Sequence, residues 1–312
     1  MKFISLILSG VLFLVSCCPP EESLYPCVCL TYESESTVDI VCDDLDNEHD
    51  LQNAAAACKK MPNMHTFMIV NSVLNYIPHS TFEGTLFKSI EVKGTTMISL
   101  SDTDEAFVGL ENTLDSLAIV KSTIGLWNWS KLKDLTRMTH LEARDVGLQS
   151  IENDINYLRF LRSVDFSKNE ISWICDHAFE NFSSLTHFVI PENEIKKLKR
   201  SMFPNHAYIL RFINLRKNQI QTLPRDIFEN MPKLTTLLIG ENHILTLDEK
   251  TFSPIWDNLR YLEVGGNDLR CDCRMTWIIT RRLRGSILGY CAEPPELKGT
   301  NLTKLNEKDL WC

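Results

Sequence analysis

One stretch of the chain decides its fold: Leu210-Arg-Phe-Ile213-Asn-Leu215-Arg-Lys-Asn218-Gln-Ile220-Gln-Thr-Leu223-Pro224. Apolar and other residues alternate at its start, which is typical of a short strand with one buried face, and an asparagine follows. The same frame recurs around three further asparagines and begins again before a fourth: Asn169, Asn193, Asn242 and Asn267. A pattern with a fixed period indicates stacked units that bury their apolar faces against one another.

Weaker copies of the frame precede these, and other residues take the place of the asparagine: Ser72, Thr95, Ser122 and Val146. The nine anchor positions are spaced 23 to 27 residues apart, and in five units a phenylalanine follows ten residues later: Phe82, Phe179, Phe203, Phe228 and Phe252. This register identifies about nine leucine-rich repeats. We predict an α/β solenoid with a curved parallel sheet on its concave face. Because an asparagine can bond backbone groups at the turn, we expect the units without it to be less regular.

The composition excludes several classes of protein. Of the 312 residues, 44% are hydrophobic and 23% charged, as in a folded globular chain. With 32 Lys and Arg against 41 Asp and Glu the net charge is −9, which argues against nucleic-acid binding. No nucleophile elbow, H-E-x-x-H motif, P-loop or G-x-G-x-x-G motif is present, and Cys175-Asp176-His177 is adjacent in sequence only. We expect no enzymatic activity, no cofactor and no metal.

The N-terminus has the pattern of a secretory signal peptide. An apolar run over residues 3–15 follows Lys2 and is too short to span a bilayer. We predict a signal peptide over residues 1–17, with cleavage after Ser16 or after Cys17. The alternative is a bacterial lipobox that would present Cys17 for acylation: Leu14-Val15-Ser16-Cys17. No second apolar stretch of membrane length follows, so we expect a secreted, extracellular protein without a membrane anchor.

Three Asn-x-Ser/Thr sequons favour a eukaryotic secretory route: Asn128-Trp129-Ser130, Asn181-Phe182-Ser183 and Asn301-Leu302-Thr303. We predict N-glycosylation at Asn128, Asn181 and Asn301. The alternative is a chance match in polar loops.

The cysteines gather where an open solenoid needs caps: Cys18, Cys27, Cys29 and Cys42 at the front, and Cys271, Cys273, Cys291 and Cys312 at the back. A C-x-C pair could form half of a zinc site, but an even set at each end of a secreted chain favours disulfides. We predict an N-terminal cap over residues 18–63, repeats over 64–270 and a C-terminal cap over 271–312.

Both flanks carry a distinctive cysteine order. The front reads C…C-x-C…C, and the back reads Asn267-Asp-Leu-Arg-Cys271-Asp-Cys273-Arg-Met-Thr-Trp277. They resemble the cysteine-rich flanks of extracellular leucine-rich repeat proteins. The resemblance implies first-to-third and second-to-fourth pairing: Cys18–Cys29, Cys27–Cys42, Cys271–Cys291 and Cys273–Cys312. It also implies that Trp277 lies on a short helix of the C-terminal cap.

A more specific pattern lies in Cys18-Pro-Pro, Tyr25-Pro-Cys27-x-Cys29 and the terminal Trp311-Cys312. It resembles arthropod secreted proteins similar to the non-catalytic subunit of the Oplophorus luciferase. Two cysteines remain outside the caps. Cys58 follows an alanine run and is expected to be a small buried residue, while Cys175 is either a half-buried thiol or half of an intermolecular disulfide. Retention of Cys17 would raise the front set to six.

Binding residues are expected on the concave face, where alternate strand positions point to solvent. Aromatic and apolar groups gather there in the later repeats, with one asparagine among them: His187, Val189, Phe212, Asn214, Leu238 and Tyr261. Apolar patches with polar rims mark interaction sites, so we predict a protein-binding surface. The alternative is that these residues pack against a flank or a glycan.

A basic stretch without acids runs from residue 196 to 217: Lys196, Lys197, Lys199, Arg200, Arg211, Arg216 and Lys217. It is a candidate anion-binding site for a sulfated glycan or an acidic protein. The alternative is a solvated rim of the solenoid.

Together these features predict a secreted, non-enzymatic protein-binding module whose partner is another secreted protein. The narrower resemblance implies a non-catalytic partner or carrier subunit. The alternatives are a matrix or innate-immune recognition protein that binds a glycan or microbial ligand, and a homodimer formed through the concave face.

Overall fold

The computed structural model describes residues 18–31 and 37–312 of the chain. The predicted signal peptide, residues 1–17, lies outside the described residues, and so does Cys17. In the described part of the chain, no helix is both long and apolar enough to cross a bilayer.

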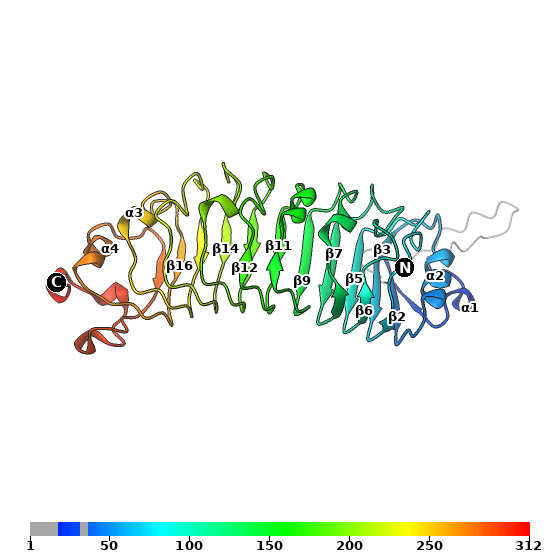
Figure 1. Ribbon diagram of the computed structural model, residues 1–312, viewed down its shortest axis with the longest axis horizontal. Helices are drawn as coiled ribbons and strands as arrows, with labels where there is room; N and C mark the ends of the chain where they lie inside the picture. The colour runs from blue at the N-terminus through cyan, green and yellow to red at the C-terminus, as the bar shows by residue number, and fades with distance from the viewer. Residues whose placement is uncertain (1–17, 32–36) are drawn as a thin grey trace, which may run out of the picture.

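The chain forms an elongated stack of coils whose strands lie side by side in one twelve-stranded sheet (Figure 1). The strands follow in this order: β1 (Val28–Thr31), β2 (Val38–Asp43), β3 (Met64–Val70), β5 (Ser89–Lys93), β7 (Ser116–Val120), β9 (His140–Arg144), β11 (Ser163–Asp165), β13 (His187–Val189), β14 (Phe212–Asn214), β15 (Thr236–Leu238), β16 (Tyr261–Glu263) and β17 (Ser286–Leu288). The pair β1–β2 is antiparallel, and the pairs that follow are parallel. This is the predicted leucine-rich repeat solenoid.

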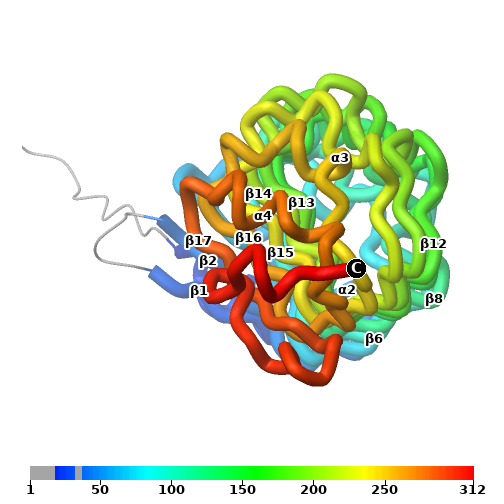
Figure 2. Tube along the Cα trace, turned by 90° about the vertical axis from the view of Figure 1, so that its left-hand side faces the viewer, coloured from blue at the N-terminus to red at the C-terminus, as the bar shows by residue number. Residues whose placement is uncertain are grey.

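Viewed along the stack, the coils overlap in a closed ring with the sheet on one side (Figure 2). Two smaller parallel sheets run along another side: β4 (Val73–Leu74), β6 (Thr96–Ser99) and β8 (Thr123–Leu126), and then β10 (Ser150–Ile151) with β12 (Trp173–Ile174). The return path carries short helices: η1 (Trp129–Leu132), η2 (Asn153–Leu158), η3 (Arg200–Met202) and α3 (Glu249–Phe252).

The core is one continuous file of apolar side chains inside the ring. The strands from β3 to β16 in this sheet each contribute an inward-facing residue, and these residues are in register and buried together: Phe67, Ile90, Leu117, Leu141, Val164, Phe188, Ile213, Leu237 and Leu262. The phenylalanines of the return path close the other side; the rings of Phe179 and Phe188 lie 5.1 Å apart, edge to face. Such ring pairs contribute about 0.5–1.5 kcal/mol beyond their buried area.

Asparagines hold the turns of the later repeats. The amide of Asn218 accepts a hydrogen bond from the Ile195 N–H at 3.1 Å and donates to the carbonyls of Ile190 and Leu215 at 3.0 and 3.1 Å. Four other asparagines make the same kind of contacts: Asn169, Asn193, Asn242 and Asn267. The side chain therefore links two neighbouring coils at each turn.

As expected, the early repeats vary more in length than the later ones, from 23 to 27 residues against 24 to 25, but their strands are longer. In the twelve-stranded sheet, β3, β5, β7 and β9 have five to seven residues, whereas β11, β13, β14, β15 and β16 have three. Hydroxyl groups replace the amides: the Thr95 N–H donates to Ser122 Oγ at 3.2 Å, and the Ser72 N–H donates to Thr95 Oγ1 at 3.3 Å. The chain after each of these turns also pairs with its neighbours, as β4–β6–β8.

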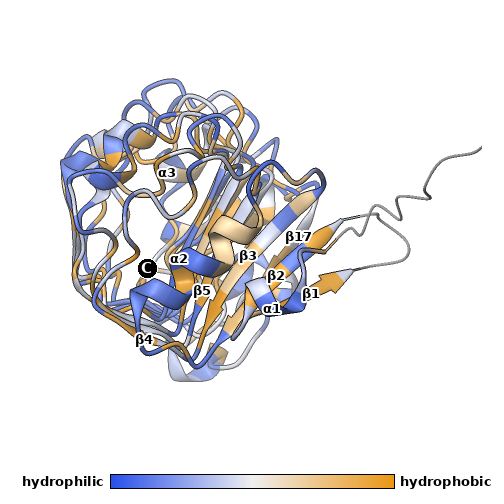
Figure 3. Cartoon of the chain, turned by 90° about the vertical axis from the view of Figure 1, so that its right-hand side faces the viewer, coloured by the Kyte–Doolittle hydropathy of each residue, from blue (hydrophilic) through white to orange (hydrophobic). Residues whose placement is uncertain are grey.

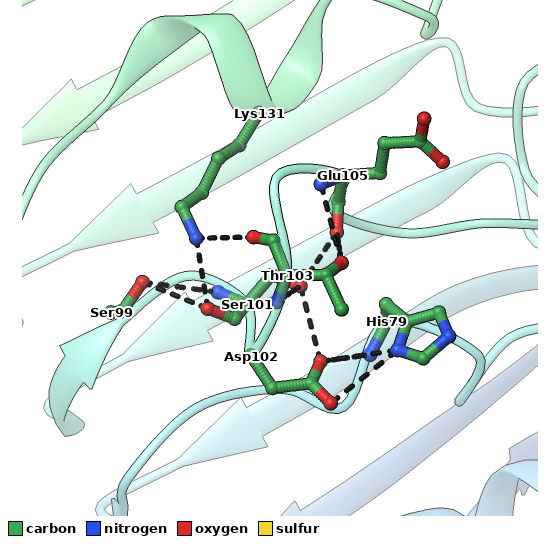
Figure 4. Close-up of polar contacts among 7 residues, drawn as sticks. All are labelled: His79, Ser99, Ser101, Asp102, Thr103, Glu105 and Lys131. Atoms are coloured by element: carbon green, nitrogen blue, oxygen red, sulfur yellow. Dashed lines mark hydrogen bonds and ion pairs between the residues drawn. The ribbon is translucent and has the colours of Figure 1, made fainter.

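The longest repeat carries a loop that is tied to both neighbouring coils (Figure 4). The ammonium group of Lys131 donates to the carbonyl oxygens of Ser101, at 3.0 Å, and Thr103. On the other side the His79 N–H donates to Asp102 Oδ1 at 2.8 Å. Burial acts to raise the pKa of Asp102, but the hydrogen bonds and the charge of His79 outweigh it and lower the pKa below the usual value.

At the N-terminal end, α2 (Glu48–Ala57) lies across the opening of the coil (Figure 3). The Asn47 side chain caps this helix by accepting a hydrogen bond from the Asp50 N–H at 2.9 Å. The helix buries its own residues Leu51, Ala54 and Ala55. The disulfides Cys18–Cys29 and Cys27–Cys42 join α1 (Glu21–Leu24), β1 and β2. A cap of this kind covers the apolar face of the first repeat, which otherwise would meet water.

The C-terminal end is covered by η4 (Cys273–Met275), α4 (Thr276–Thr280), η5 (Pro295–Leu297), η6 (Leu302–Lys304) and η7 (Glu307–Asp309). Disulfides join Cys271 to Cys291 and Cys273 to Cys312, so all four pairs are those that the resemblance implies. Trp277 lies on α4, also as implied, and its indole N–H donates to the Leu247 carbonyl at 2.8 Å.

Candidate binding face

The six predicted binding residues lie on four neighbouring strands, β13 to β16. Because these strands pair in parallel register, their first residues form the row His187, Phe212, Thr236 and Tyr261. Their last residues form the row Val189, Asn214, Leu238 and Glu263. The residue between them on each strand is buried in the core, so both rows face away from it. Strand alternation thus brings the six residues onto one surface.

The side chains of this surface are partly exposed rather than covered. His187 is exposed, and the other five predicted residues are half-buried. The rings of His187 and Phe212 lie 5.7 Å apart at a tilt of 32°. Thr236 separates Phe212 from Tyr261 along one row, so the apolar groups form a zigzag across the strands. We call the six residues the apolar surface.

A charged cluster borders the apolar surface and had escaped the sequence reasoning. Arg216 Nη2 lies 2.7 Å from Glu241 Oε1, and its Nε lies 3.2 Å from Oε2 of the buried Glu263. Burial raises the pKa of the Glu263 carboxyl, and the Arg216 guanidinium opposes that rise. Gly240 makes room for the cluster, because a Cβ there would lie 2.5 Å from Glu263 Oε1. Gly240 directly precedes Glu241 in the sequence, but Glu263 lies one repeat further on and at a different repeat position, so no local pattern announced the cluster.

The earlier half of the concave face is polar instead. The row that contains Val189 and Asn214 continues in register through Asp165, Glu142, Ala118 and Glu91. Two acids pair with bases on their own strands, Glu91 with Lys93 and Glu142 with Arg144, the latter at 2.7 Å. Burial raises the pKa of Glu142; Arg144 lowers it, and the charges of Asp165 and Glu91 add to the rise.

The structure does not gather the predicted anion-binding residues into one free basic patch. Lys199 pairs with Asp176 at 2.9 Å, Lys217 with Glu192 at 3.9 Å, and Arg216 with the two acids already named. The Arg200 guanidinium donates to three backbone carbonyls: those of Glu229, Phe203 and Pro204. Within the described residues, no carboxylate forms an ion pair with the remaining three: Lys196, Lys197 and Arg211.

The Cys175-Asp176-His177 segment lacks the geometry of a catalytic pair. His177 Nδ1 lies 3.2 Å from Glu180, while Asp176 pairs with Lys199. Burial raises the pKa of the Cys175 thiol, and nearby Glu152 and Asp176 add to the rise, which is opposite to what a nucleophilic thiolate requires. Cys58 is buried, donates to the Ala54 carbonyl at 3.3 Å, and has its pKa raised by burial to about 12.

One group of possible metal ligands is found among the described residues: Asp272, Cys273 and Cys312. The two sulfur atoms are joined in a disulfide, so neither is a thiolate that could bind zinc. Asp272 is occupied as well, because Arg274 donates to both of its carboxylate oxygens at 2.9 and 2.6 Å. These contacts give Asp272 a structural role in the C-terminal cap.

Comparison with known proteins agrees with the fold. Residues 210–269 match the family model described as leucine rich repeat. No curated protein matches the chain, so the narrower resemblance to the luciferase-subunit group has no support from a relative.

Two solved structures are similar. One is described as an octameric complex of Latrophilin 3 (Lec, Olf), Unc5D (Ig, Ig2, TSP1) and FLRT2 (LRR); the TM-score is 0.64 at 18% identity, over 89% of this chain and 91% of that chain. The other is described as a TLR13–ssRNA13 complex; the TM-score is 0.60 at 16% identity, over 81% of this chain and 39% of that chain. At these identities the likeness supports the fold alone.

Proposed function

We propose that the protein is a secreted, non-enzymatic binding module that docks another secreted protein on the apolar surface of β13 to β16. Solenoids of this kind present extended concave surfaces to their ligands. The single observation that carries the proposal is the alignment of partly exposed aromatic and aliphatic groups on four strands, beside the charged cluster of Arg216, Glu241 and Glu263. Interfaces commonly have an apolar centre with aromatic anchors and a polar rim.

We further propose the role of a non-catalytic partner or carrier subunit, which rests on the cysteine pattern described above. The predicted signal peptide, the three glycosylation sites and the cap boundaries belong to the same proposal. Four disulfides support an oxidising compartment, because cytosolic proteins keep their thiols reduced. One of the two similar structures is described as a complex of several proteins, which is compatible with a docking role.

Gentle purification of the native secreted protein, with mass determination and identification of co-eluting chains, tests the subunit role. A second protein at fixed stoichiometry is the expected result. A lone species at the monomer mass would contradict an obligate subunit, and a mass that doubles with concentration would indicate a homodimer.

Variants of the apolar surface test the docking face once the partner is in hand. Phe212→Ser and Leu238→Ser should each weaken binding at least about tenfold, since a central anchor contributes about 1.4 kcal/mol or more. Leu245→Ser is the matched control, because Leu245 is an aliphatic side chain that is 55% exposed away from the concave face. Equal losses in all three variants would count against this surface.

The alternative, recognition of a glycan or microbial ligand through the basic stretch, has weaker support because three of its seven cations are ion-paired. Binding through Lys196, Lys197 and Arg211 would weaken steeply with added salt, whereas binding through the apolar surface would change little. A salt titration of the measured affinity separates the two.

A further inference from the structure

A second surface lies on the return path of the coils, far from the concave sheet in the repeat. Here a cavity of about 610 Å³ opens between the loop after η1, the helix η2 and the start of the next return path. It is an open depression rather than an enclosed pocket, so an occupant there would stay in contact with solvent. The residues that matter in its wall are Asp154, Tyr157, Arg159, Phe160 and Asn181.

Two aromatic rings stand exposed in this wall. Tyr157 is 57% exposed and Phe160 is 41% exposed, and the Arg159 guanidinium lies 5.1 Å above the Phe160 ring. Exposed rings beside a few polar groups suit a ligand with apolar faces and polar edges. Sugar rings have this character, because their C–H faces stack on aromatic rings while their hydroxyl groups form hydrogen bonds.

The polar groups of the wall are not all satisfied within the protein. Asp154 Oδ2 accepts the Trp129 N–H at 3.1 Å, but its Oδ1 is buried and has no hydrogen-bond partner. A buried acceptor without a partner costs free energy, but this oxygen has no surface open to solvent, so it lies beneath the wall and does not face a ligand in the cavity. Burial raises the pKa of Asp154, consistent with an incompletely solvated carboxyl.

Asn181, which begins the second sequon, is itself part of the cavity wall. Its backbone N–H donates to Asn156 Oδ1 at 3.3 Å, and the neighbouring Phe182 is buried, so its position beside η2 is fixed. No hydrogen bond of the Asn181 side chain is found in the described part of the protein. The other two sequon asparagines differ: Asn128 and Asn301 each cap a 3₁₀ helix with Oδ1.

We propose that the cavity is the seat of the N-linked glycan carried by Asn181. The first sugars stack on Tyr157 and Phe160, and their hydroxyl groups contact Arg159. The occupant follows from geometry, because the attachment residue lies in the wall of the cavity it would fill. This inference rests on the secretory route of the proposed function, and it is independent of the apolar surface.

The test is endoglycosidase digestion of the full chain, secreted from eukaryotic cells, followed by mass spectrometry of each sequon peptide over time. We expect the glycan at Asn181 to be released at least about tenfold more slowly than glycans at the other two sequons, which serve as internal controls. In the variant Tyr157→Ser, Asn181 should be released nearly as fast as the controls. Because Tyr157 is exposed, this variant should fold, and its secretion level and circular dichroism check that it does.

Four outcomes would overturn the inference. Equal release rates at Asn181 and at the controls would mean that the glycan is not seated. An unchanged slow rate in Tyr157→Ser and in the double variant Tyr157→Ser/Phe160→Ser would mean that the rings do not hold it. An unmodified Asn181 on a secreted chain would remove the occupant and leave the secretory route intact, whereas a chain that is never secreted would remove both.

Discussion

The two halves of the stack hold the same turn by different chemistry. After residue 169 each turn depends on one asparagine; Asn218, for example, satisfies one N–H and at least two carbonyls. In the earlier half the hydroxyl of Ser122 accepts the Thr95 N–H at 3.2 Å and donates to the Val120 carbonyl at 3.0 Å. A hydroxyl offers one donor, while an amide offers two.

The earlier half compensates with backbone hydrogen bonds. Its concave strands are longer, and β4, β6 and β8 form a second ladder just after the turns. The coils therefore follow the same path in both halves. Side-chain hydrogen bonds hold the turns of the later half, and backbone hydrogen bonds between neighbouring coils hold those of the earlier half. The comparison teaches that the asparagine is required where backbone pairing is short, and replaceable where it is long.

The junction between the halves should be the most sensitive position. Asn169 Oδ1 accepts two N–H groups, those of Val146 at 3.0 Å and Leu148 at 3.2 Å, and Nδ2 donates to the Ala143 carbonyl at 2.7 Å. Asn169 therefore forms the hydrogen bonds at the turn of the preceding repeat, where the anchor residue Val146 has no polar side chain. Asn169→Ala should lower the free energy of unfolding by at least about 3 kcal/mol, because each unpaired buried group costs about 1–3 kcal/mol.

Urea denaturation followed by circular dichroism measures this loss. Ser122→Ala is the matched control in the earlier half and should lose only about 1–2 kcal/mol. Equal losses in the two variants would break the comparison.

A serine should not replace an asparagine in the later half. Asn218→Ser should lose about 2 kcal/mol, because the hydroxyl can keep one contact but not the bonds to both Ile190 and Leu215. Thr95→Ser keeps the hydroxyl group at a turn that hydroxyl groups already hold, so its free energy of unfolding should stay within about 0.5 kcal/mol of that of the parent. The same denaturation measurement applies, and a neutral Asn218→Ser would show that the backbone alone supports the later turns.

The repeat period was sufficient to predict the array, the concave rows and the place of each anchor, because one unit fixes the register of the next. The small sheet of β4, β6 and β8 could not be predicted. In the sequence, Ser72, Thr95 and Ser122 indicate only that the asparagine amide is missing, and the backbone pairing that compensates for it is visible only in the structure. The repeat period also placed Phe212 and Leu238 on one face, but it could not predict which acids form ion pairs with Arg216. The partners Glu241 and Glu263 lie one and two repeats further on, and only the geometry of the coils brings them within 2.7 and 3.2 Å.

Two glycines at the same repeat position differ in their surroundings, and this difference gives a sharper contrast within one row. Gly240→Ala should cost about 1–3 kcal/mol, because the new Cβ would lie 2.5 Å from Glu263 Oε1 and 2.8 Å from the Gly265 carbonyl. Gly265→Ala is the control at the next repeat, where the nearest atom is the Leu288 carbonyl at 3.9 Å. Thermal unfolding of both variants is the measurement, and a neutral Gly240→Ala would mean that Glu263 moves aside freely.

The smallest expected effect concerns pH and two carboxyls of the earlier half, Glu142 on the concave face and Asp102 on the loop of the longest repeat. The folded-state pKa of Glu142 is raised, chiefly by burial, so its contribution to stability is present at low pH and is lost as pH rises from about 4.5 through that pKa. Asp102 has the opposite sign: hydrogen bonds from His79 outweigh burial and lower its pKa, so its contribution is lost as pH falls below about 3.8. Melting temperatures across pH 3 to 8, about the range in which carboxyls titrate, should therefore diverge in opposite directions for Glu142→Gln and Asp102→Asn. The free energy of unfolding of each variant should differ from that of the parent by less than about 1 kcal/mol, because water screens a partly exposed carboxyl. Parallel profiles in both variants would show that the pairing of Glu142 with Arg144 outweighs its burial, and the polar half would then be held by charge as well as by backbone.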